Sequence, residues 1–436
     1  MSFLNFLRSR ISPQNSFLLL YHKLKAVLAA IFYRFPANRL KIIAVTGTKG
    51  KSTAVHFIAS ILREAGHKVG VASTIQFQIG DRIWFNDTKQ TTQGPFALQS
   101  LLREMVKARC EFAVIEITSH AMTQSRAWGI NIDAAVLTNI QRDHIEYHGN
   151  FENYLYAKGL LFSLLPRLER KAGIQKTAVL PAEDPNVNYF ETFACDKKLL
   201  YGFGKGIIRA ENMQLSADGS DFTLKVPNSE IDIHINIPGE FNVLNALAAA
   251  SAAISFGVKL EAVKKGLEAA MEIPGRLEVI KLGQPFTVVV DYAHTAESLE
   301  KLLSLFKSLT KGKLFLVFGA TGGGRDKLKR PEMGAVADKY ADYIVATDDD
   351  PYTEDRMQII NQVSEGIKRR EGHNFWKIRD RRQAIRLALS LAGEGDTVIV
   401  AGKGCEPIQI IGEERIPWDD RKVVREILSS EAKVEL

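Results

Sequence analysis

The chain has few cysteines, and they form no recognisable type of site. Its three cysteines, Cys110, Cys195 and Cys405, lie far apart and show no C-x-x-C spacing. We therefore expect neither a disulfide framework nor a zinc site, and we expect the protein to work in a reducing cytoplasm. Internal repeats and low-complexity tracts are lacking too, and nothing near the N-terminus is typical of a cleavable signal peptide.

Long hydrophobic runs are also scarce. The most apolar N-terminal stretch, residues 17–35, is interrupted by His22, Lys23, Lys25 and Arg34, so its longest unbroken apolar run covers residues 26–33. That run is too short to span a bilayer. We expect a helix that docks on the protein, with peripheral contact to a membrane surface as the alternative.

The sequence has no cluster of basic and aromatic residues like those of single-strand nucleic-acid binders. Its net charge of +7 over 436 residues suits an anionic substrate but is too dilute for a nucleic-acid footprint. The content of 46% hydrophobic and 25% charged residues is typical of a soluble globular protein. We therefore predict small-molecule substrates, no nucleic acid and a monomer.

The most informative stretch is AVTGTKGKST at residues 44–53, which follows a predicted strand and begins a helical pattern. A strand, a glycine-containing turn and a helix N-terminus, in that order, form a phosphate-binding loop. Backbone N–H groups face the anion, Lys51 adds a positive charge, and the Ser52 hydroxyl can bind Mg²⁺. The usual pattern has glycine where Val45 stands, so this loop is a variant. It predicts a nucleoside triphosphate site.

The pattern of strands and helices predicts an α/β protein of two or three domains. Residues 1–39 are predicted to form a short helical segment, and residues 40–275 a central P-loop ATPase domain with a mainly parallel sheet. Within the central domain, residues 176–237 are interpreted as a small antiparallel extension. Residues 276–436 alternate again and predict a C-terminal Rossmann-like α/β domain.

Three further stretches place polar residues where chemistry is expected. Glu116 ends a predicted buried strand, where a carboxylate binds a cation such as Mg²⁺ or, alternatively, pairs with a lysine. The loop LTNIQRDHIEYHG at residues 137–149 follows another buried strand and contains His144, which could instead be a hydrogen-bonded loop anchor. Lys158 lies among apolar residues of a predicted helix and, taken alone, would be a surface lysine.

Together and in this order, these stretches resemble the Mur ligase superfamily, and within it the UDP-N-acetylmuramoyl-tripeptide synthetases. The shared motifs extend from about residue 40 to the end of the chain: GTKGKST, Thr91-Thr92, EITSHAMTQSR, TNIQRDHIEYHG, YxxAKxxLF, FNVLNA at 241–246, PGR at 274–276, DYAHT at 291–295, GGGRD at 322–326, KRP at 329–331, DDP at 349–351 and GKGCE at 402–406.

The resemblance implies an ATP-dependent, ADP-forming carboxylate–amine ligase of peptidoglycan synthesis, which activates a carboxylate as an acyl phosphate and adds an amino acid. It implies that Lys51 and the loop amides hold the β- and γ-phosphates, and that Ser52 and Glu116 hold one Mg²⁺. A second Mg²⁺ would be held by His144 and a carbamate formed from CO₂ on Lys158. The implied catalytic residues are Lys51, Glu116, His144 and Lys158.

The resemblance also implies three sets of binding residues. For ATP they are Gly47, Thr48, Lys49, Gly50, Lys51, Ser52, Thr53, Asn245, Arg276 and Asp291. For the muramoyl-peptide nucleotide they are Thr91, Thr92, Ser119, Gln124 and Arg126. For the incoming amino acid they are Arg325, Asp349, Asp350, Tyr352, Gly402 and Glu406.

Two departures from the family pattern concern the substrates. Members that add meso-diaminopimelate have Asp-Asn-Pro-Arg, whose arginine binds the distal carboxylate, whereas residues 349–352 here are DDPY. Tyr352 cannot make that bidentate contact, and the acidic run at 348–350 favours a cationic group such as that of lysine. Arg325 could still bind a carboxylate, so diaminopimelate stays open. Cys405, where the family usually has histidine, is predicted to be a neutral packing substitution.

The second departure is the segment before the phosphate-binding loop. The family usually has an N-terminal domain that holds the uridine nucleotide, whereas about 40 residues precede the loop here, too few for an independent core. We expect either that the nucleotide is held without that domain or that the acceptor is another carboxylate, such as a lipid-linked muropeptide.

Two other functions compete with this interpretation. A folylpolyglutamate or polyglutamate-type ligase would share the loop and the carbamate, but the acidic pocket disfavours glutamate as the added residue. A catalytically silent ATP-binding interaction protein is disfavoured because Ser52, Glu116, His144 and Lys158 are all present. A simple GTPase or transport ATPase fits less well because Val45 replaces the loop glycine.

Overall fold

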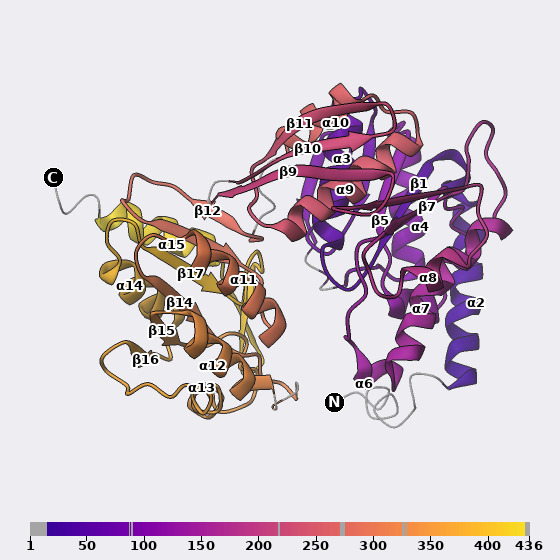
Figure 1. Cartoon of the computed structure of the whole chain (residues 1–436). Coiled ribbons are helices and arrows are strands. Elements are labelled where there is room, and N and C mark those ends of the chain that lie inside the picture. Colours follow the sequence, from indigo (N-terminus) through magenta and orange to yellow (C-terminus); the bar gives the residue numbers. More distant parts are fainter. Residues whose placement is uncertain are drawn as a thin grey trace. The chain divides into compact units, whose positions relative to one another are not determined.

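The computed structural model describes residues 15–86, 88, 90–216, 219–270, 275–324, 327 and 329–431. Contacts divide this part of the chain into two compact α/β units, which Figure 1 colours along the sequence. The first unit holds nearly all described residues up to Ala270, and the second holds those from Gly275 onward with short pieces near 216–219 and 237–239. The predicted α/β class with mainly parallel sheets is confirmed. The domain boundaries predicted from the sequence, between residues 39 and 40 and between residues 275 and 276, stay predictions.

The first unit is built on a sheet of eleven strands in the order β11-β10-β9-β8-β7-β6-β1-β5-β2-β3-β4. The strands are β1 (Lys41–Thr46), β2 (Val69–Ala72), β3 (Gln76–Ile79), β4 (Arg82–Phe85), β5 (Phe112–Glu116), β6 (Ala134–Leu137), β7 (Thr177–Pro181), β8 (Lys197–Gly202), β9 (Ile208–Ser216), β10 (Gly219–Val226) and β11 (Ser229–Ile235). The pairs from β9 through β8, β7, β6, β1 and β5 to β2 are parallel. The predicted antiparallel extension is therefore wrong for β7 and β8, because the short helix α8 (Val187–Glu191) returns the chain in the same direction; β10 and β11 are antiparallel.

Helices cover both faces of this sheet because alternate strand residues point to opposite faces. The remaining helices of the unit are α2 (Ser16–Tyr33), α3 (Lys51–Glu64), α4 (Pro95–Lys107), α5 (Ser119–Thr123), α6 (Ile145–His148), α7 (Phe151–Leu164), α9 (Glu240–Ser255) and α10 (Leu260–Glu268), with 3-10 turns at Pro36–Arg39 and Leu165–Arg167. One face packs Ala44, Ile115 and Leu137 with side chains of α4 and α7. The other face is covered by α3 and α9, which contact each other and the central strands.

The N-terminal helix α2 packs against α4, as predicted for a helix that docks on the protein. Its buried residues are Ala26, Ala29 and Ala30. On length and composition alone, this 18-residue helix could cross a membrane, and only 17% of it is buried inside the protein. The longest unbroken apolar run had suggested that this segment is too short to span a bilayer. By the length and composition of the whole helix, that expectation is wrong.

The second unit has a six-stranded sheet in the order β12-β13-β17-β14-β15-β16 and a separate hairpin, β18-β19. The strands are β12 (Glu278–Ile280), β13 (Thr287–Asp291), β14 (Leu314–Phe318), β15 (Tyr343–Ala346), β16 (Phe375–Lys377), β17 (Thr397–Ala401), β18 (Ile408–Ile411) and β19 (Glu414–Pro417); the helices are α11 (Ala296–Leu309), α12 (Lys329–Tyr340), α13 (Arg356–Ser364), α14 (Arg381–Leu391) and α15 (Asp420–Glu431). All neighbouring pairs in the sheet are parallel except β12-β13. The alternation of strands and helices predicted for this part of the chain is confirmed.

Candidate active site

The phosphate-binding loop connects β1 to α3, as predicted. Gly47 and Gly50 have φ angles of 146° and 82°, a region that side chains disfavour. A Cβ atom on Gly47 would lie 1.9 Å from Thr138 Oγ1, and one on Gly50 would lie 2.2 Å from Asn245 Oδ1. No side chain caps the first turn of α3. The positive end of the helix therefore faces the loop, as an anion site requires.

The loop is held by the segment that follows β6. The Thr48 N–H donates to Asn139 O (2.9 Å), the Lys49 N–H donates to Asn139 Oδ1 (3.1 Å), and the Lys51 ammonium donates to Gly47 O (3.0 Å) and Thr48 O (2.9 Å). Lys51 is thus kept beside the loop, where a bound phosphate would lie. Ser52 lies in the first turn of α3, and Thr53 follows it with its side chain buried.

Glu116 is the last residue of β5 and lies opposite Val45 in the parallel pairing of β5 with β1. The carboxyl ends of these strands therefore meet at the edge where the loop begins. The residue is 1% exposed, and its carboxylate accepts hydrogen bonds from the Thr74 N–H (3.0 Å) and the Thr74 hydroxyl (2.9 Å). Within the described ranges, the structure shows no lysine or arginine paired with Glu116, so pairing with a lysine is not supported.

Lys158 reaches the loop from α7 and is not the surface lysine that its position alone would suggest. It is 2% exposed, and its Nζ donates to Gly47 O at 2.7 Å. Burial, together with the nearby positive charge of Lys51, holds the pKa of Lys158 well below its ordinary value, while Asp143 acts in the opposite direction. Its Nζ lies 4.9 Å from the ring centroid of Tyr154, one helical turn earlier.

His144 belongs to a group of aromatic side chains next to Lys158. Its ring centroid lies 4.9 Å from that of His120 and 6.4 Å from that of Tyr154, whose hydroxyl lies 2.8 Å from Thr48 Oγ1. Burial, followed by the nearby His144 and other basic groups, lowers the pKa of His120 to about 3. His120 is therefore neutral at physiological pH and can accept a hydrogen bond through an unprotonated ring nitrogen.

Four of the five residues predicted to contact the muramoyl-peptide nucleotide form one polar network beside Glu116. The Thr92 hydroxyl donates to Glu116 O (2.9 Å), and Arg126 Nη1 donates to Thr92 O (2.7 Å). Arg126 also donates to Gln124 Oε1 at 3.0 and 2.6 Å. Thr91 joins the network because its Oγ1 accepts from Thr74 Oγ1 (3.0 Å). The fifth residue, Ser119, has its Oγ 3.0 Å from His148 Nε2.

Asn245, on α9, is buried against Gly50 of the loop. The first unit therefore brings the predicted loop residues, Glu116, Lys158, His144 and Asn245 to one edge of the sheet. A binder of ATP and a divalent cation fits this donor set, because it combines an uncapped helix end, hydroxyl and carboxylate oxygens and a buried amine of lowered pKa.

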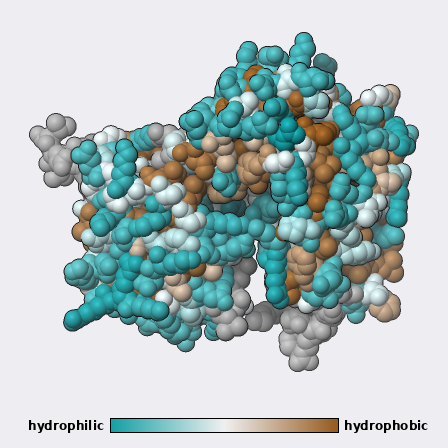
Figure 2. Space-filling view, in the orientation of Figure 1, coloured by the Kyte–Doolittle hydropathy of each residue, from teal (hydrophilic) through white to brown (hydrophobic). Residues whose placement is uncertain are grey.

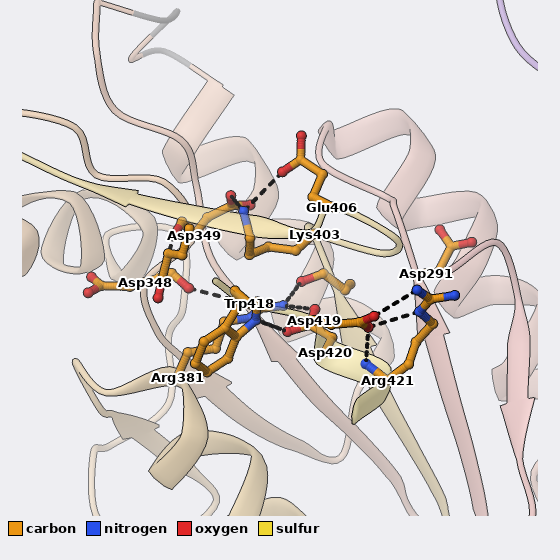
Figure 3. A network of polar contacts seen from close by, with 12 residues as sticks. Asp291, Asp348, Asp349, Arg381, Lys403, Glu406, Trp418, Asp419, Asp420 and Arg421 are labelled. Atoms are coloured by element: carbon orange, nitrogen blue, oxygen red, sulfur yellow. Dashed lines mark hydrogen bonds and ion pairs between the residues drawn. The ribbon is translucent and has the colours of Figure 1, made fainter. Parts of the chain in front are cut away.

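In the second unit, three of the residues predicted to bind the incoming amino acid, Asp349, Asp350 and Glu406, gather around Lys403 (Figure 3). Its ammonium lies 2.9 Å from an oxygen of Asp350, 2.9 Å from Glu406 and 3.8 Å from Asp349. The three carboxylates have ligand atoms within 4.8 Å of one another, a spacing that a metal ion could also use. The Lys403 ammonium occupies this cluster, and the nearby carboxylates raise its pKa.

The acidic run is less available than the sequence suggested. Asp348 pairs with Arg356, and Asp350 pairs with Lys403. Only Asp349 Oδ2 is a buried carboxylate oxygen without a hydrogen-bond partner among the described residues. It lies next to Gly402, whose φ is 116° and where a Cβ would come within 2.7 Å of it.

Tyr352, with φ of 52°, lies beside an open depression of about 450 Å³ that is also lined by Gly323, Glu354 and Arg415. Arg325 lies outside the described residues.

Arg276 and Asp291, the other predicted ATP contacts, also belong to the second unit. The Asp291 carboxylate is buried and accepts from the N–H groups of Leu277 (2.9 Å) and Ala293 (2.8 Å). Burial raises its pKa, although Arg276 acts in the opposite direction. The Arg276 guanidinium lies 4.6 Å from the ring centroid of Tyr292. The predicted role of both residues in binding ATP stays a prediction.

Four residues that contribute to these sites were not singled out from the sequence: Thr74, His120, Tyr154 and Lys403. Tyr154 and Lys158 are spaced i,i+4 on one helix, a signal that was available. His120 lies inside the motif EITSHAMTQSR, and Lys403 lies inside GKGCE. Thr74 had no local signal, because its contact with Glu116 joins segments 42 residues apart.

Comparisons with known proteins agree with this geometry. Residues 45–253 match the Mur ligase middle domain, and residues 275–404 match the domain described as "Mur ligase, glutamate ligase domain". The chain is 40% identical over 403 residues to the UDP-N-acetylmuramoyl-L-alanyl-D-glutamate–2,6-diaminopimelate ligase of Geobacillus thermodenitrificans, covering 92% of this chain and 81% of the relative. It is also 40% identical over 416 residues to the UDP-N-acetylmuramyl-tripeptide synthetase of Roseiflexus sp., covering 93% and 81%.

Solved structures show the same similarity. A UDP-N-acetylmuramoyl-L-alanyl-D-glutamate–2,6-diaminopimelate ligase is 34% identical with a TM-score of 0.66, covering 90% of this chain and 79% of that one. A folylpolyglutamate synthase of Mycobacterium tuberculosis has a TM-score of 0.69, covering 87% and 92%, but only 18% identity, so it shows likeness of fold alone.

Proposed function

Because the chain belongs to the Mur ligase superfamily, whose members are ATP-dependent, ADP-forming amide ligases, we propose that it adds the third residue to a peptidoglycan precursor such as UDP-N-acetylmuramoyl-dipeptide. The observation that carries this proposal is the contact of the buried Lys158 Nζ with Gly47 O. It joins the phosphate-binding loop to a lysine of lowered pKa, a combination that a simple nucleotide-binding protein does not need. The names of the relatives support the acceptor and the amide chemistry.

In the proposed reaction, the acceptor carboxylate is activated as an acyl phosphate, and the amine of the incoming amino acid then displaces phosphate. The protein's task is to hold two anions together, so cations and fixed N–H groups do most of the work. Lys51 and the first turn of α3 hold the β- and γ-phosphates. Ser52 and Glu116 would hold one Mg²⁺ ion, and His144 and modified Lys158 a second; bound Mg²⁺ neutralises phosphate charge.

A carbamate on Lys158 explains why a lysine stands at this position. A protonated amine would repel both Mg²⁺ and Lys51, whereas addition of CO₂ to the uncharged amine, with loss of a proton, gives a negatively charged oxygen ligand. The lowered pKa of Lys158 increases the share of uncharged amine that can react. Burial then protects the carbamate from solvent.

The network of Thr91, Thr92, Gln124 and Arg126 is proposed to position the acceptor. Arg126 is held by Gln124 and Thr92 rather than by a carboxylate, so its charge is available for an anionic group of the substrate. The network hydrogen-bonds to the backbone of Glu116 through Thr92. Acceptor and proposed Mg²⁺ would thereby be held by one connected structure, as near-attack positioning requires.

We propose that the added residue is a diamino acid. The cluster of Asp349, Asp350 and Glu406 carries three carboxylates for one lysine, and Asp349 Oδ2 lacks a partner among the residues described, so the cluster favours a cationic ligand group. Diaminopimelate and lysine both carry such a group. The names of the relatives favour diaminopimelate, whereas Tyr352 lacks the charge that would bind its distal carboxylate. We propose that the reaction takes place in the cytoplasm, where ATP is available.

The test is phosphate release from ATP with UDP-N-acetylmuramoyl-dipeptide and a panel of amino acids. Diaminopimelate or lysine should stimulate release, with a product heavier by one amino-acid residue, and Lys158→Met should serve as the inactive control. Release with a folate and glutamate instead would support a polyglutamate-type ligase. Binding of ATP without release under any condition would support a silent binding protein. Either result would overturn the proposal.

A further inference from the structure

The N-terminal helix α2 places small side chains inward and large apolar side chains outward. Its buried residues are three alanines, Ala26, Ala29 and Ala30. Seven large apolar residues are between 54% and 85% exposed: Phe17, Leu20, Tyr21, Leu24, Leu28, Ile31 and Phe32. A helix that only completed a core would show the opposite arrangement. The exposed face therefore calls for a contact outside the unit.

These seven side chains form one continuous stripe, here called the α2 stripe. At about 100° per residue they fall within an arc of about 120°. Phe96 of α4, itself exposed, extends the surface, because its ring centroid lies 6.3 Å from that of Phe32 and 6.5 Å from that of Tyr33. Figure 2 shows hydrophobic surface on the side of the first unit where α2 lies. Contiguous apolar surface of this kind marks a contact with another protein or a membrane.

The charges around the stripe distinguish between these partners. Lys23 and Lys25 lie on opposite borders of the stripe, about 80° to 120° from its centre at the helical repeat. The first 63 residues contain no aspartate or glutamate, and residues 1–39 contain six lysines and arginines. A second copy of the chain would bring like charges together across the interface. An anionic lipid surface complements both the apolar stripe and the basic borders.

The opposite face of α2 determines how the helix meets the lipid. It packs on α4, and Ala30 Cβ lies 2.6 Å from where a Cβ on Gly129 would be, so Gly129 provides the space for this close approach. A helix that crossed the bilayer would have to leave this contact. We propose that α2 lies in the plane of an anionic membrane surface, with the α2 stripe among the acyl chains and its alanine face still docked on α4. This proposal does not depend on the proposed reaction.

The experiment is flotation of the full chain with vesicles of phosphatidylcholine mixed with phosphatidylglycerol, and with vesicles of phosphatidylcholine alone. Wild-type protein should float with the mixed vesicles and about 25-fold less with the neutral ones, since each of the two lysines near an anionic surface improves partitioning by about fivefold. The variant Leu24→Glu/Leu28→Glu should lose flotation by at least about tenfold, because it places two charges in the apolar stripe. Its thermal unfolding and ligase activity on a soluble acceptor should match the wild type.

The matched control is Leu282→Glu/Leu391→Glu, which alters two leucines of similar exposure in the second unit. It should float like the wild type. The proposal is overturned if the α2 variant floats as well as this control, or if wild-type protein fails to bind. It is also overturned if the wild type is a dimer in solution that the α2 variant dissociates. Finally, wild-type protein should leave the vesicles at alkaline pH; retention there would indicate a spanning helix.

Discussion

Replacing Lys158 with methionine separates a catalytic role of this lysine from a structural one. The substitution keeps the length of the side chain and removes the amine. If a carbamate on Lys158 holds a Mg²⁺ ion, we expect kcat to fall by at least about 100-fold, since even loss of residues that support metal ligands costs about 10- to 100-fold. A 100-fold loss corresponds to about 2.7 kcal/mol of transition-state stabilisation.

Stability should change little, or even increase, in the same variant. Gly47 O, the acceptor of the Lys158 hydrogen bond, also accepts from Lys51 Nζ at 3.0 Å, so no buried acceptor is left unpaired. The pKa of Lys158 is lowered in the folded protein. The unfolded chain therefore binds the proton more readily, and the wild type loses stability as pH falls below the unfolded value of about 10.4. Methionine removes this loss, so we expect an unfolding free energy within about 1 kcal/mol of the wild type, or above it.

The assay combines steady-state phosphate release, thermal unfolding and chemical rescue. Formate or another short carboxylic acid should restore part of the activity of Lys158→Met, because it supplies the missing carboxylate oxygen. Lys198→Met, at an exposed lysine far along the chain, serves as the control and should show normal activity with no effect of formate. Near-normal turnover of Lys158→Met without rescue would refute the carbamate. A parallel drop in activity and stability would instead assign Lys158 to the fold.

Four further outcomes are expected. Glu116→Gln should keep the hydrogen bond from Thr74 but lose about 100-fold in kcat and require more Mg²⁺ in a titration, with little change in Tm. Lys403→Met should raise KM for the amino acid about tenfold and reduce unfolding free energy by about 3 kcal/mol in denaturant titrations, since it leaves clustered carboxylates without their cation. Burial lowers the pKa of His294 to about 4, so the unfolded chain takes up a proton at this residue before the folded protein does. The free energy of unfolding should therefore fall by up to about 3 kcal/mol between pH 6.5 and 4. The variant His294→Gln should lack this pH dependence. Tyr352→Arg should increase the preference for diaminopimelate over lysine in competition assays by about tenfold.

The parts of the fold that sequence reasoning predicted are those with strong local signals. The strand before the phosphate-binding loop, the helix after it and the buried strands ending at Glu116 and Leu137 combine apolar runs with glycine or polar residues at their ends. The strands at β7 and β8 were misassigned in direction because strand direction depends on how the chain crosses over. The five-residue α8 that makes this crossover has too little periodicity to be seen in a sequence.

The contacts that complete the candidate site depend on tertiary structure. Thr74 reaches Glu116, and Lys158 reaches Gly47 across 111 residues, so no spacing in the sequence announces either pair. The acidic run at 348–350 suggested an available anionic pocket, but Arg356 and Lys403 neutralise much of it. The apolar N-terminal helix was correctly predicted to dock. Its exposed stripe became visible only when the structure showed that the docked face consists of alanines.

The phosphate-binding loop also influences the chemical state of Lys158. Lys51 and Lys158 both donate to the same carbonyl oxygen, that of Gly47. Burial removes the solvent that would stabilise a charged Lys158, and the positive charge of Lys51 repels it, so the pKa of Lys158 falls. In the proposed modification, the uncharged amine would add CO₂, and the carbamate would change the repulsion from Lys51 into attraction. Mutation of Lys51 to methionine should therefore weaken carbamate formation as well as phosphate binding, which couples the two halves of the proposed site through one backbone atom.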